Sequence, residues 1–278
     1  MSLKDIFVHL DTSAACERRV NAALMLAREH AAHLTGVAIV SRPYIPAYAE
    51  VEIGMEIIKE RQQQMRDALE DVGAVFDEQA GQSGVTGEWR ILEGEPSDIL
   101  SEQARYSDLM VLSQDETAND ILLGGQEIPE RVILTSGRPA RIVPRIYKDE
   151  QIGKHVLVGW DRGRMAARAV HDSLSVLQTA EKVTIMTANP TTNESGNGGI
   201  SGADLAVHLA RHGVSVEADH TVSEDLDIGD LLLSRAADLQ ADLIVLGAYG
   251  HARWRKLVLG GVTKHMLEHM PVPVLMSH

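Results

Sequence analysis

Glycines near the carboxyl end of the chain have the spacing of a loop that can hold an anion. Gly247 closes an apolar run, Gly250 follows after two residues, and Gly260 follows after nine more. Glycines just beyond a buried parallel strand let backbone N–H groups approach a phosphate, and the helix expected next adds partial positive charge. The chemistry predicted here is nucleotide binding through the main chain. The alternative is that these glycines only turn the chain tightly.

Other phosphate-binding and hydrolytic motifs are absent from the sequence. There is no Gly-x4-Gly-Lys-Ser/Thr, no Gly-x-Gly-x-x-Gly after a first strand and no Gly-x-Ser-x-Gly, so P-loop hydrolysis, dinucleotide binding and a common hydrolase site lose their usual support. His265 and His269 lie four residues apart, which we interpret as one solvated helix face rather than a zinc site. We therefore predict no catalytic residues and no metal ligands.

At these residues the sequence resembles the universal stress protein A family, over the whole chain as two tandem copies. The resemblance implies a Rossmann-like fold with a five-stranded parallel sheet in each copy. Nucleotide-binding members carry Gly-x2-Gly-x9-Gly followed by Ser or Thr, and here Gly261 stands at the hydroxyl position. It offers an N–H but no hydroxyl, whereas Thr263, two residues later, offers another oxygen.

The same resemblance suggests further contacts with an adenine nucleotide. Asp161 ends the first strand of the second copy, where the equivalent aspartate lies beside the nucleoside; capping of the next helix is an equal alternative. The main chain from Met186 to Ala188 is expected to read the adenine edge, and Arg253 either pairs with phosphates or solvates the loop tip. The predicted nucleotide-binding residues are Asp161, Met186, Ala188, Gly247, Gly250, His251, Arg253, Gly260, Gly261, Val262 and Thr263.

Three pairs of similar segments, in the same order, indicate an internal duplication. The pairs are 6–11 with 156–161, 97–100 with 229–232, and 108–112 with 242–246. We therefore predict two domains, residues 1–148 and 152–278, joined by a short polar segment. Each half alternates apolar strands with helical patterns, which favours an α/β fold with helices on both faces of a parallel sheet.

The expected elements follow from these patterns. Strands are expected near 5–11, 34–40, 86–92, 108–113, 140–145, 155–161, 182–188, 214–221, 242–247 and 272–277. Helices are expected near 14–31, 51–73, 97–106, 127–136, 164–178, 201–212, 228–239 and 262–269. Segments 141–144 and 272–276 are expected to pair as an intramolecular pseudo-dimer, and a homodimer remains open.

The first copy has lost the predicted phosphate loop. Residues 113–116 read Ser-Gln-Asp-Glu where the second copy has Gly-Ala-Tyr-Gly, and two carboxylates there would repel a phosphate. We interpret the amino-terminal half as a structural or regulatory partner, and Asp11 as a helix cap rather than a ligand.

Composition limits the function classes. The net charge is −14, from 26 basic and 40 acidic residues without a basic stripe, which argues against nucleic acid and anionic membranes as partners. The sequence shows no apolar run of 18 residues and no signal-peptide pattern, so we expect a cytoplasmic protein. The single cysteine, Cys16, excludes an internal disulfide.

Two functions of different class remain open. The first is a stress-response module in which ATP, with or without Mg²⁺, binds the second domain and changes a partner-binding surface. The second is a nucleotide-free interaction or scaffolding protein that keeps its glycines for turns. A slow ATPase is a third and weaker alternative.

Overall fold

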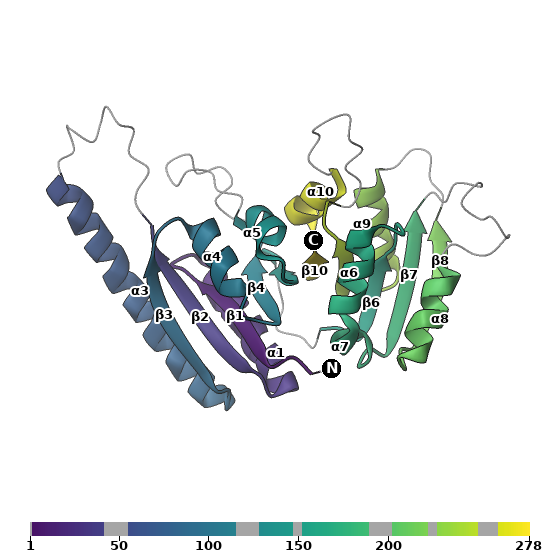
Figure 1. Ribbon diagram of the computed structural model, residues 1–278, viewed down its shortest axis with the longest axis horizontal. Coiled ribbons are helices and arrows are strands. Elements are labelled where there is room, and N and C mark those ends of the chain that lie inside the picture. Colours follow the sequence, from purple (N-terminus) through teal and green to yellow (C-terminus); the bar gives the residue numbers. More distant parts are fainter. Residues whose placement is uncertain are drawn as a thin grey trace. The chain divides into compact units, whose positions relative to one another are not determined.

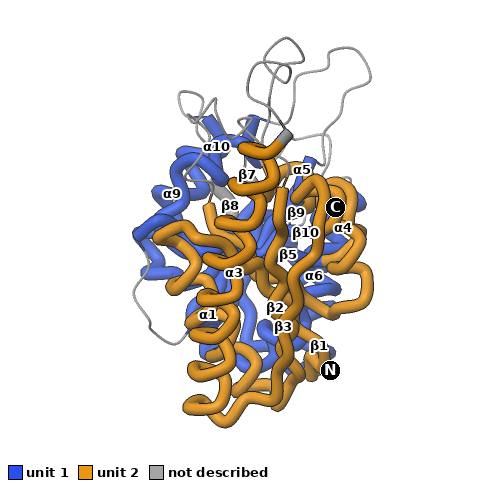
Figure 2. The backbone as a smooth tube through the Cα atoms, turned by 90° about the vertical axis from the view of Figure 1, so that its left-hand side faces the viewer, with its two compact units in different colours: residues 1, 139–278 blue, residues 2–138 orange. Residues whose placement is uncertain are grey.

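The computed structural model describes residues 2–41, 55–114, 128–146, 152–188, 202–221, 227–249 and 261–278 (Figure 1). The chain divides into two compact units, 2–138 and 139–278 (Figure 2). We call them the N-terminal unit and the C-terminal unit. Both are α/β units with parallel strands, as the sequence predicts.

The N-terminal unit contains a parallel sheet in the order β3-β2-β1-β4. Its strands are β1 (Asp5–Leu10), β2 (His33–Val40), β3 (Gly87–Glu93) and β4 (Leu109–Ser113). Its helices are α1 (Ala15–His30), α3 (Met55–Ser83), α4 (Pro96–Ala104) and α5 (Ile128–Ser136). Helix α3 packs on β2 and β3, and α1 packs on β1 and β4 (Figure 1).

The C-terminal unit contains a sheet in the order β5-β10-β9-β6-β7-β8. Its strands are β5 (Ala140–Val143), β6 (His155–Gly159), β7 (Lys182–Ala188), β8 (Val216–Thr221), β9 (Leu243–Gly247) and β10 (Val274–Ser277). Its helices are α6 (Arg164–Asp172), α7 (Leu174–Leu177), α8 (Ala203–Arg211), α9 (Ile228–Asp238) and α10 (Gly261–His269). All strand pairs are parallel except β5 with β10, which is antiparallel.

The strands form because their sequences suit burial on both faces. Strands β4 and β9 are nearly continuous apolar runs, and Ile244 and Val245 are fully buried on β9 although neighbouring side chains point to opposite faces. A parallel sheet covered by helices needs this composition. Burying each of these side chains stabilises the fold by about 1.5–3 kcal/mol.

Two helices differ from the sequence prediction. Helix α3 continues ten residues beyond the expected end at 73, because the buried side chains Leu69, Phe76 and Ala80 continue its apolar stripe. It ends before Gly84, which has a left-handed backbone with φ +67°. The single helix expected over 164–178 is divided into α6 and α7 at Ser173.

An aspartate at the start of one strand ties down the start of its neighbour in both units. The carboxylate of Asp108 accepts the N–H groups of residues 4 and 5 at 2.7 and 3.1 Å. That of Asp242 accepts three N–H groups, of residues 153–155, at 2.9, 3.0 and 3.3 Å. Asp242 therefore lies at the amino edge of the sheet, away from the ends where ligands bind such folds.

Strand β5 comes from the first sequence half but pairs within the C-terminal unit. Ile142 lies opposite Val274, and Ala140 lies opposite Met276. The segments expected to pair with each other therefore do so. None of the helices in the described ranges is both long and apolar enough to span a membrane.

Candidate functional site

The turn after β6 contains Asp161, the first predicted ligand. Its Oδ1 accepts the N–H of Gly163 at 2.7 Å, and Gly163 is the N-cap of α6. A Cβ on Gly163 would lie 2.8 Å from this carboxylate oxygen. The N-cap of α6 is therefore Gly163 and not Asp161, so the capping interpretation is wrong in this detail. The Asp161 carboxylate holds the turn before the helix, and its side chain is exposed to solvent at the carboxyl edge of the sheet.

Gly247, at the end of β9, lies against the first turn of α6. A Cβ on this residue would lie 2.3 Å from the nitrogen of Ala166 and 2.4 Å from the carbonyl carbon of Met165. These are backbone atoms, so no rotamer change would relieve the contact. The close approach of α6 to β9 requires glycine here, independently of any ligand.

The start of α10 lies beside the end of β9. Thr263 is 5% exposed, and its hydroxyl accepts the N–H of Tyr249 at 3.1 Å. Gly261 is exposed at the first position of α10, and no described atom lies within 4 Å of the place where a Cβ would stand. Val262 is half-buried. The N–H groups of the first turn of α10 therefore lie near the carboxyl end of β9.

The predicted adenine-reading segment lies on the neighbouring strand. Met186 is 1% exposed, and its carbonyl accepts the N–H of Trp160 at 2.9 Å. Ala188 ends β7 and pairs with Thr221 of β8. The structure thus places Met186 beside Trp160, which directly precedes Asp161 in the sequence.

Four predicted ligands lie outside the described residues. They are Gly250, His251, Arg253 and Gly260. The structure brings Gly247 together with the first turn of α6, and Thr263 together with the end of β9.

Positive charge at this edge comes from residues that the sequence analysis did not single out. Burial lowers the pKa of His278, at the end of β10, and the charges of Arg168 and Arg164 lower it further. The ring of His278 also meets the Tyr249 ring edge-on, with centroids 6.4 Å apart. Arg164 and Arg168 of α6 are thus close enough to His278 to act on it, and Arg168 also pairs with Asp172 at 3.5 Å. Cationic groups complement phosphate.

The two histidines of α10 form a pair without a metal geometry. The His265 and His269 rings stack with centroids 4.4 Å apart, and His265 Nε2 lies 2.9 Å from Asp230 Oδ1. Within the described part of the chain, no three His, Cys, Asp or Glu side chains are placed to hold a metal ion.

Comparison with known proteins identifies the fold. Residues 153–278 match the model of the Universal stress protein family. Residues 153–278 therefore form a domain of the universal stress protein family.

Solved structures extend the similarity in fold over both units. A universal stress protein from Archaeoglobus fulgidus DSM 4304 is 15% identical over 98% of this chain and 95% of its own, with a TM-score of 0.75. A putative universal stress protein from Pseudomonas aeruginosa UCBPP-PA14 is 13% identical over 99% of this chain and 93% of its own, with a TM-score of 0.62. No curated protein matches the sequence.

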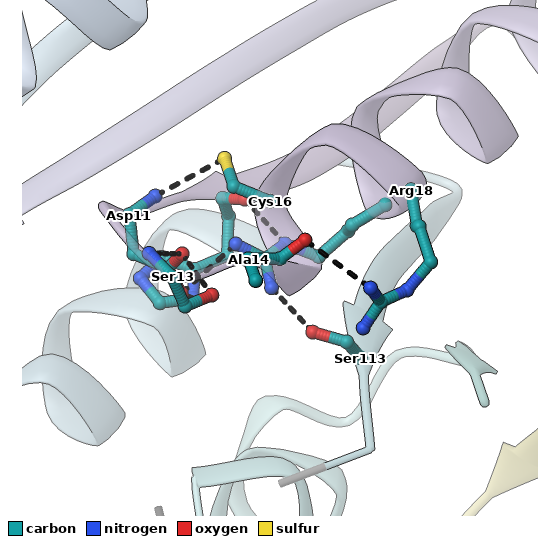
Figure 3. A network of polar contacts seen from close by, with 8 residues as sticks. Asp11, Ser13, Ala14, Cys16, Arg18 and Ser113 are labelled. Atoms are coloured by element: carbon teal, nitrogen blue, oxygen red, sulfur yellow. Dashed lines mark hydrogen bonds and ion pairs between the residues drawn. The ribbon is translucent and has the colours of Figure 1, made fainter. Parts of the chain in front are cut away.

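The N-terminal unit has a buried polar cluster at the carboxyl edge of its own sheet (Figure 3). Arg19 of α1 is 2% exposed, and its Nε donates to the His9 carbonyl at 2.6 Å. Its Nη2 lies 2.9 Å from Asp11 Oδ2, and its Nη1 donates to Ser113 at the end of β4. Asp11 also accepts the N–H and hydroxyl of Ser13 at 3.0 and 2.6 Å.

The ion pair changes the ionisation of its members. Burial, with the Arg19 charge as the second cause, lowers the pKa of His9 to about 4 although Asp11 opposes this shift. Burial alone would raise the pKa of Asp11, but Arg19, His9 and the Ser13 hydrogen bonds together hold it below its usual range. Burial raises the pKa of the Cys16 thiol. At neutral pH the cluster therefore holds a charged Asp11–Arg19 pair beside a neutral imidazole.

This cluster occupies the position that corresponds to the candidate site. Counting from the matched segments, Arg19 corresponds to the buried Ala169 and Ser113 corresponds to Gly247. In the N-terminal unit, a guanidinium of the protein itself thus lies across the ends of β1 and β4. Asp11 was predicted as a helix cap, but the N-cap of α1 is Ala14, and Asp11 bonds Ser13 in the turn before it. Arg19 was not predicted from the sequence.

Proposed function

We propose that the C-terminal unit binds an adenine nucleotide, ATP, and acts as a regulatory or binding module rather than as an enzyme. The observation that carries this proposal is the open start of α10 at Gly261, held beside the end of β9. Backbone N–H groups at a helix start favour an anion by hydrogen bonding and by the helix dipole.

Family membership and charge support the same proposal. The universal stress protein match includes every predicted ligand from Asp161 to Thr263. Arg164 and Arg168 add positive charge at the carboxyl ends of the strands, in a chain whose net charge is −14. Cationic side chains near these strand ends favour an anion there.

The residues present fit a phosphate at the main chain better than at a hydroxyl. Thr263 is buried and its oxygen already accepts a bond from Tyr249, so it is poorly placed to replace the missing Ser or Thr. At Gly261 there is room for a side chain among the described atoms. A serine at position 261 would therefore supply the hydroxyl that the family motif carries.

One observation favours a nucleotide-free interaction protein instead. Gly247 is required by the packing of α6, and the Asp161 carboxylate holds the turn that leads into the same helix. Two of the predicted ligands thus have structural roles that need no nucleotide. This second function remains the alternative if binding is absent.

The test is calorimetric titration of the nucleotide-stripped full chain with ATP and Mg²⁺. We expect one saturable site per chain, and loss of binding when Gly250 is replaced by leucine. Absence of heat at millimolar ATP, with no nucleotide released from the purified protein, would refute the proposal.

A matched pair of variants tests the chemistry at position 261. Gly261→Ser should tighten ATP binding about tenfold, because a hydrogen bond to a charged group contributes about 1.5–3 kcal/mol. Gly261→Ala has the same Cβ but no hydroxyl, so its affinity should stay near that of the unmodified chain. Equal affinities for the two variants would show that no phosphate oxygen lies near this position.

A further inference from the structure

The backbone that leaves β9 has an unusual conformation at Tyr249. Its φ is +56°, in the left-handed region that non-glycine residues rarely adopt. Such a residue persists only when its surroundings hold it there, and these residues concentrate at functional sites. Specific contacts must therefore hold the backbone of Tyr249 in this conformation.

Two hydrogen bonds supply this restraint. The N–H of Ala248 donates to the carbonyl of Ser277 at 2.8 Å, which ties the end of β9 to the end of β10. The N–H of Tyr249 donates to the hydroxyl of Thr263 at 3.1 Å, which ties the same backbone to the first turn of α10. Only the second of these bonds depends on a side chain.

Thr263 is suited to hold this position and poorly suited to touch a ligand. The residue is 5% exposed, so its hydroxyl faces the interior and not the solvent. Removing the hydroxyl would remove this hydrogen bond, and the loss of a hydrogen bond in a partly buried position is unfavourable.

We propose that Thr263 is a positioning residue of the nucleotide site, whose hydroxyl fixes the start of α10 relative to the end of β9. This inference rests on the proposed function. Gly247 lies two residues before Tyr249, and Gly261 lies two residues before Thr263, so one hydrogen bond fixes the spacing between two described members of the glycine motif. Backbone donors held in place before the ligand arrives lose less entropy on binding.

The first test needs no nucleotide. Thr263→Val keeps the shape of the side chain but removes the acceptor, whereas Thr263→Ser keeps the hydroxyl. In the full chain, amide hydrogen exchange at Tyr249 should become about tenfold faster in the valine variant and stay near normal in the serine variant. Thr184→Val is the matched control, because Thr184 is equally buried on β7 and its hydroxyl donates to Glu217 instead.

The second test measures ATP affinity in the same proteins. Thr263→Val should weaken ATP binding about tenfold, and Thr263→Ser should restore it to within about twofold of the unmodified chain. If Thr263→Val does not fold, Thr263→Ala replaces it with the same two measurements.

The outcomes separate this inference from the proposed function. Unchanged exchange at Tyr249 in Thr263→Val would overturn the positioning role, and so would faster exchange with unchanged ATP affinity. Failure of the unmodified chain to bind ATP would instead overturn the proposed function, whatever the exchange at Tyr249 shows.

Discussion

Protonation of His9 should destabilise the N-terminal unit as the pH falls. The imidazole is 8% exposed beside the Asp11–Arg19 ion pair. Burial and the Arg19 charge lower the pKa of His9 from 6.5 to about 4. The perturbation is therefore a change of pH from 8 to 4, compared between the unmodified chain and His9→Gln.

The magnitude follows from the difference between the two pKa values of His9. Below pH 6.5 the unfolded state binds a proton at His9, but the folded state does not do so until about pH 4. The stabilisation is complete above pH 6.5 and is lost as the pH falls through this window. The difference in pKa corresponds to a loss of about 3 kcal/mol in the free energy of unfolding. Asp11, whose folded pKa is lowered, loses its own contribution only below its ordinary value of 3.8.

The assay is urea denaturation followed by tryptophan fluorescence. Trp89 is the one tryptophan within residues 2–138, so replacing Trp160 and Trp254 by phenylalanine makes the signal specific for the N-terminal unit. In this background, the protein that retains His9 should lose about 3 kcal/mol in the free energy of unfolding between pH 8 and 4, and the His9→Gln variant should not. His33→Gln, outside the cluster, should retain it. Equal losses in His9→Gln and in the unmodified chain would refute the reasoning.

Two further substitutions, each with a control, test what stabilises each unit. Gly73→Ala should destabilise the N-terminal unit by about 1–3 kcal/mol and shift the emission of Trp89, because the new Cβ would lie 2.3 Å from the indole ring. The control, Gly81→Ala on the same helix, meets no described atom within 4 Å and should be neutral or slightly stabilising in the same denaturation assay. Asp242→Ala should destabilise the C-terminal unit by about 2 kcal/mol in thermal unfolding, because three N–H groups lose a charged acceptor. The control, Asp238→Ala, removes an exposed carboxylate and should change the stability little. Equal effects of the two substitutions would contradict this explanation.

Most of the fold follows from local sequence patterns. The strands are short apolar runs between polar turns, so β1 and β7 begin and end within a residue of the expected positions. The end of α3 was predicted wrongly, because Gly73 lies where the helical pattern weakens. The structure shows another reason for that glycine, since the Trp89 ring packs where its Cβ would be. The contact between Gly73 of α3 and Trp89 of β3 joins two different elements, so a local sequence pattern does not reveal it.

The candidate site was less predictable than the fold. The sequence predicted that Asp161 ends its strand, but β6 ends at Gly159 and Asp161 lies in the turn that follows. The last helix was expected from 262 and begins one residue earlier, at Gly261. Arg19 was missed because its partners His9 and Ser113 come from different strands. One signal was available: Arg19 lies three residues after Cys16, on the buried face of α1, where a charged side chain needs a partner.

The antiparallel strand β5 affects how the C-terminal unit can be separated from the rest of the chain. A fragment that begins at residue 153 would contain the whole family match but would lack residues 140–143. Strand β10 would then become an outer strand, with a row of unpaired N–H and C=O groups. A second copy of the fragment could satisfy those groups by adding its own β10, so such a fragment should self-associate. A fragment that begins before Pro139 keeps β5, so β10 retains its partner strand.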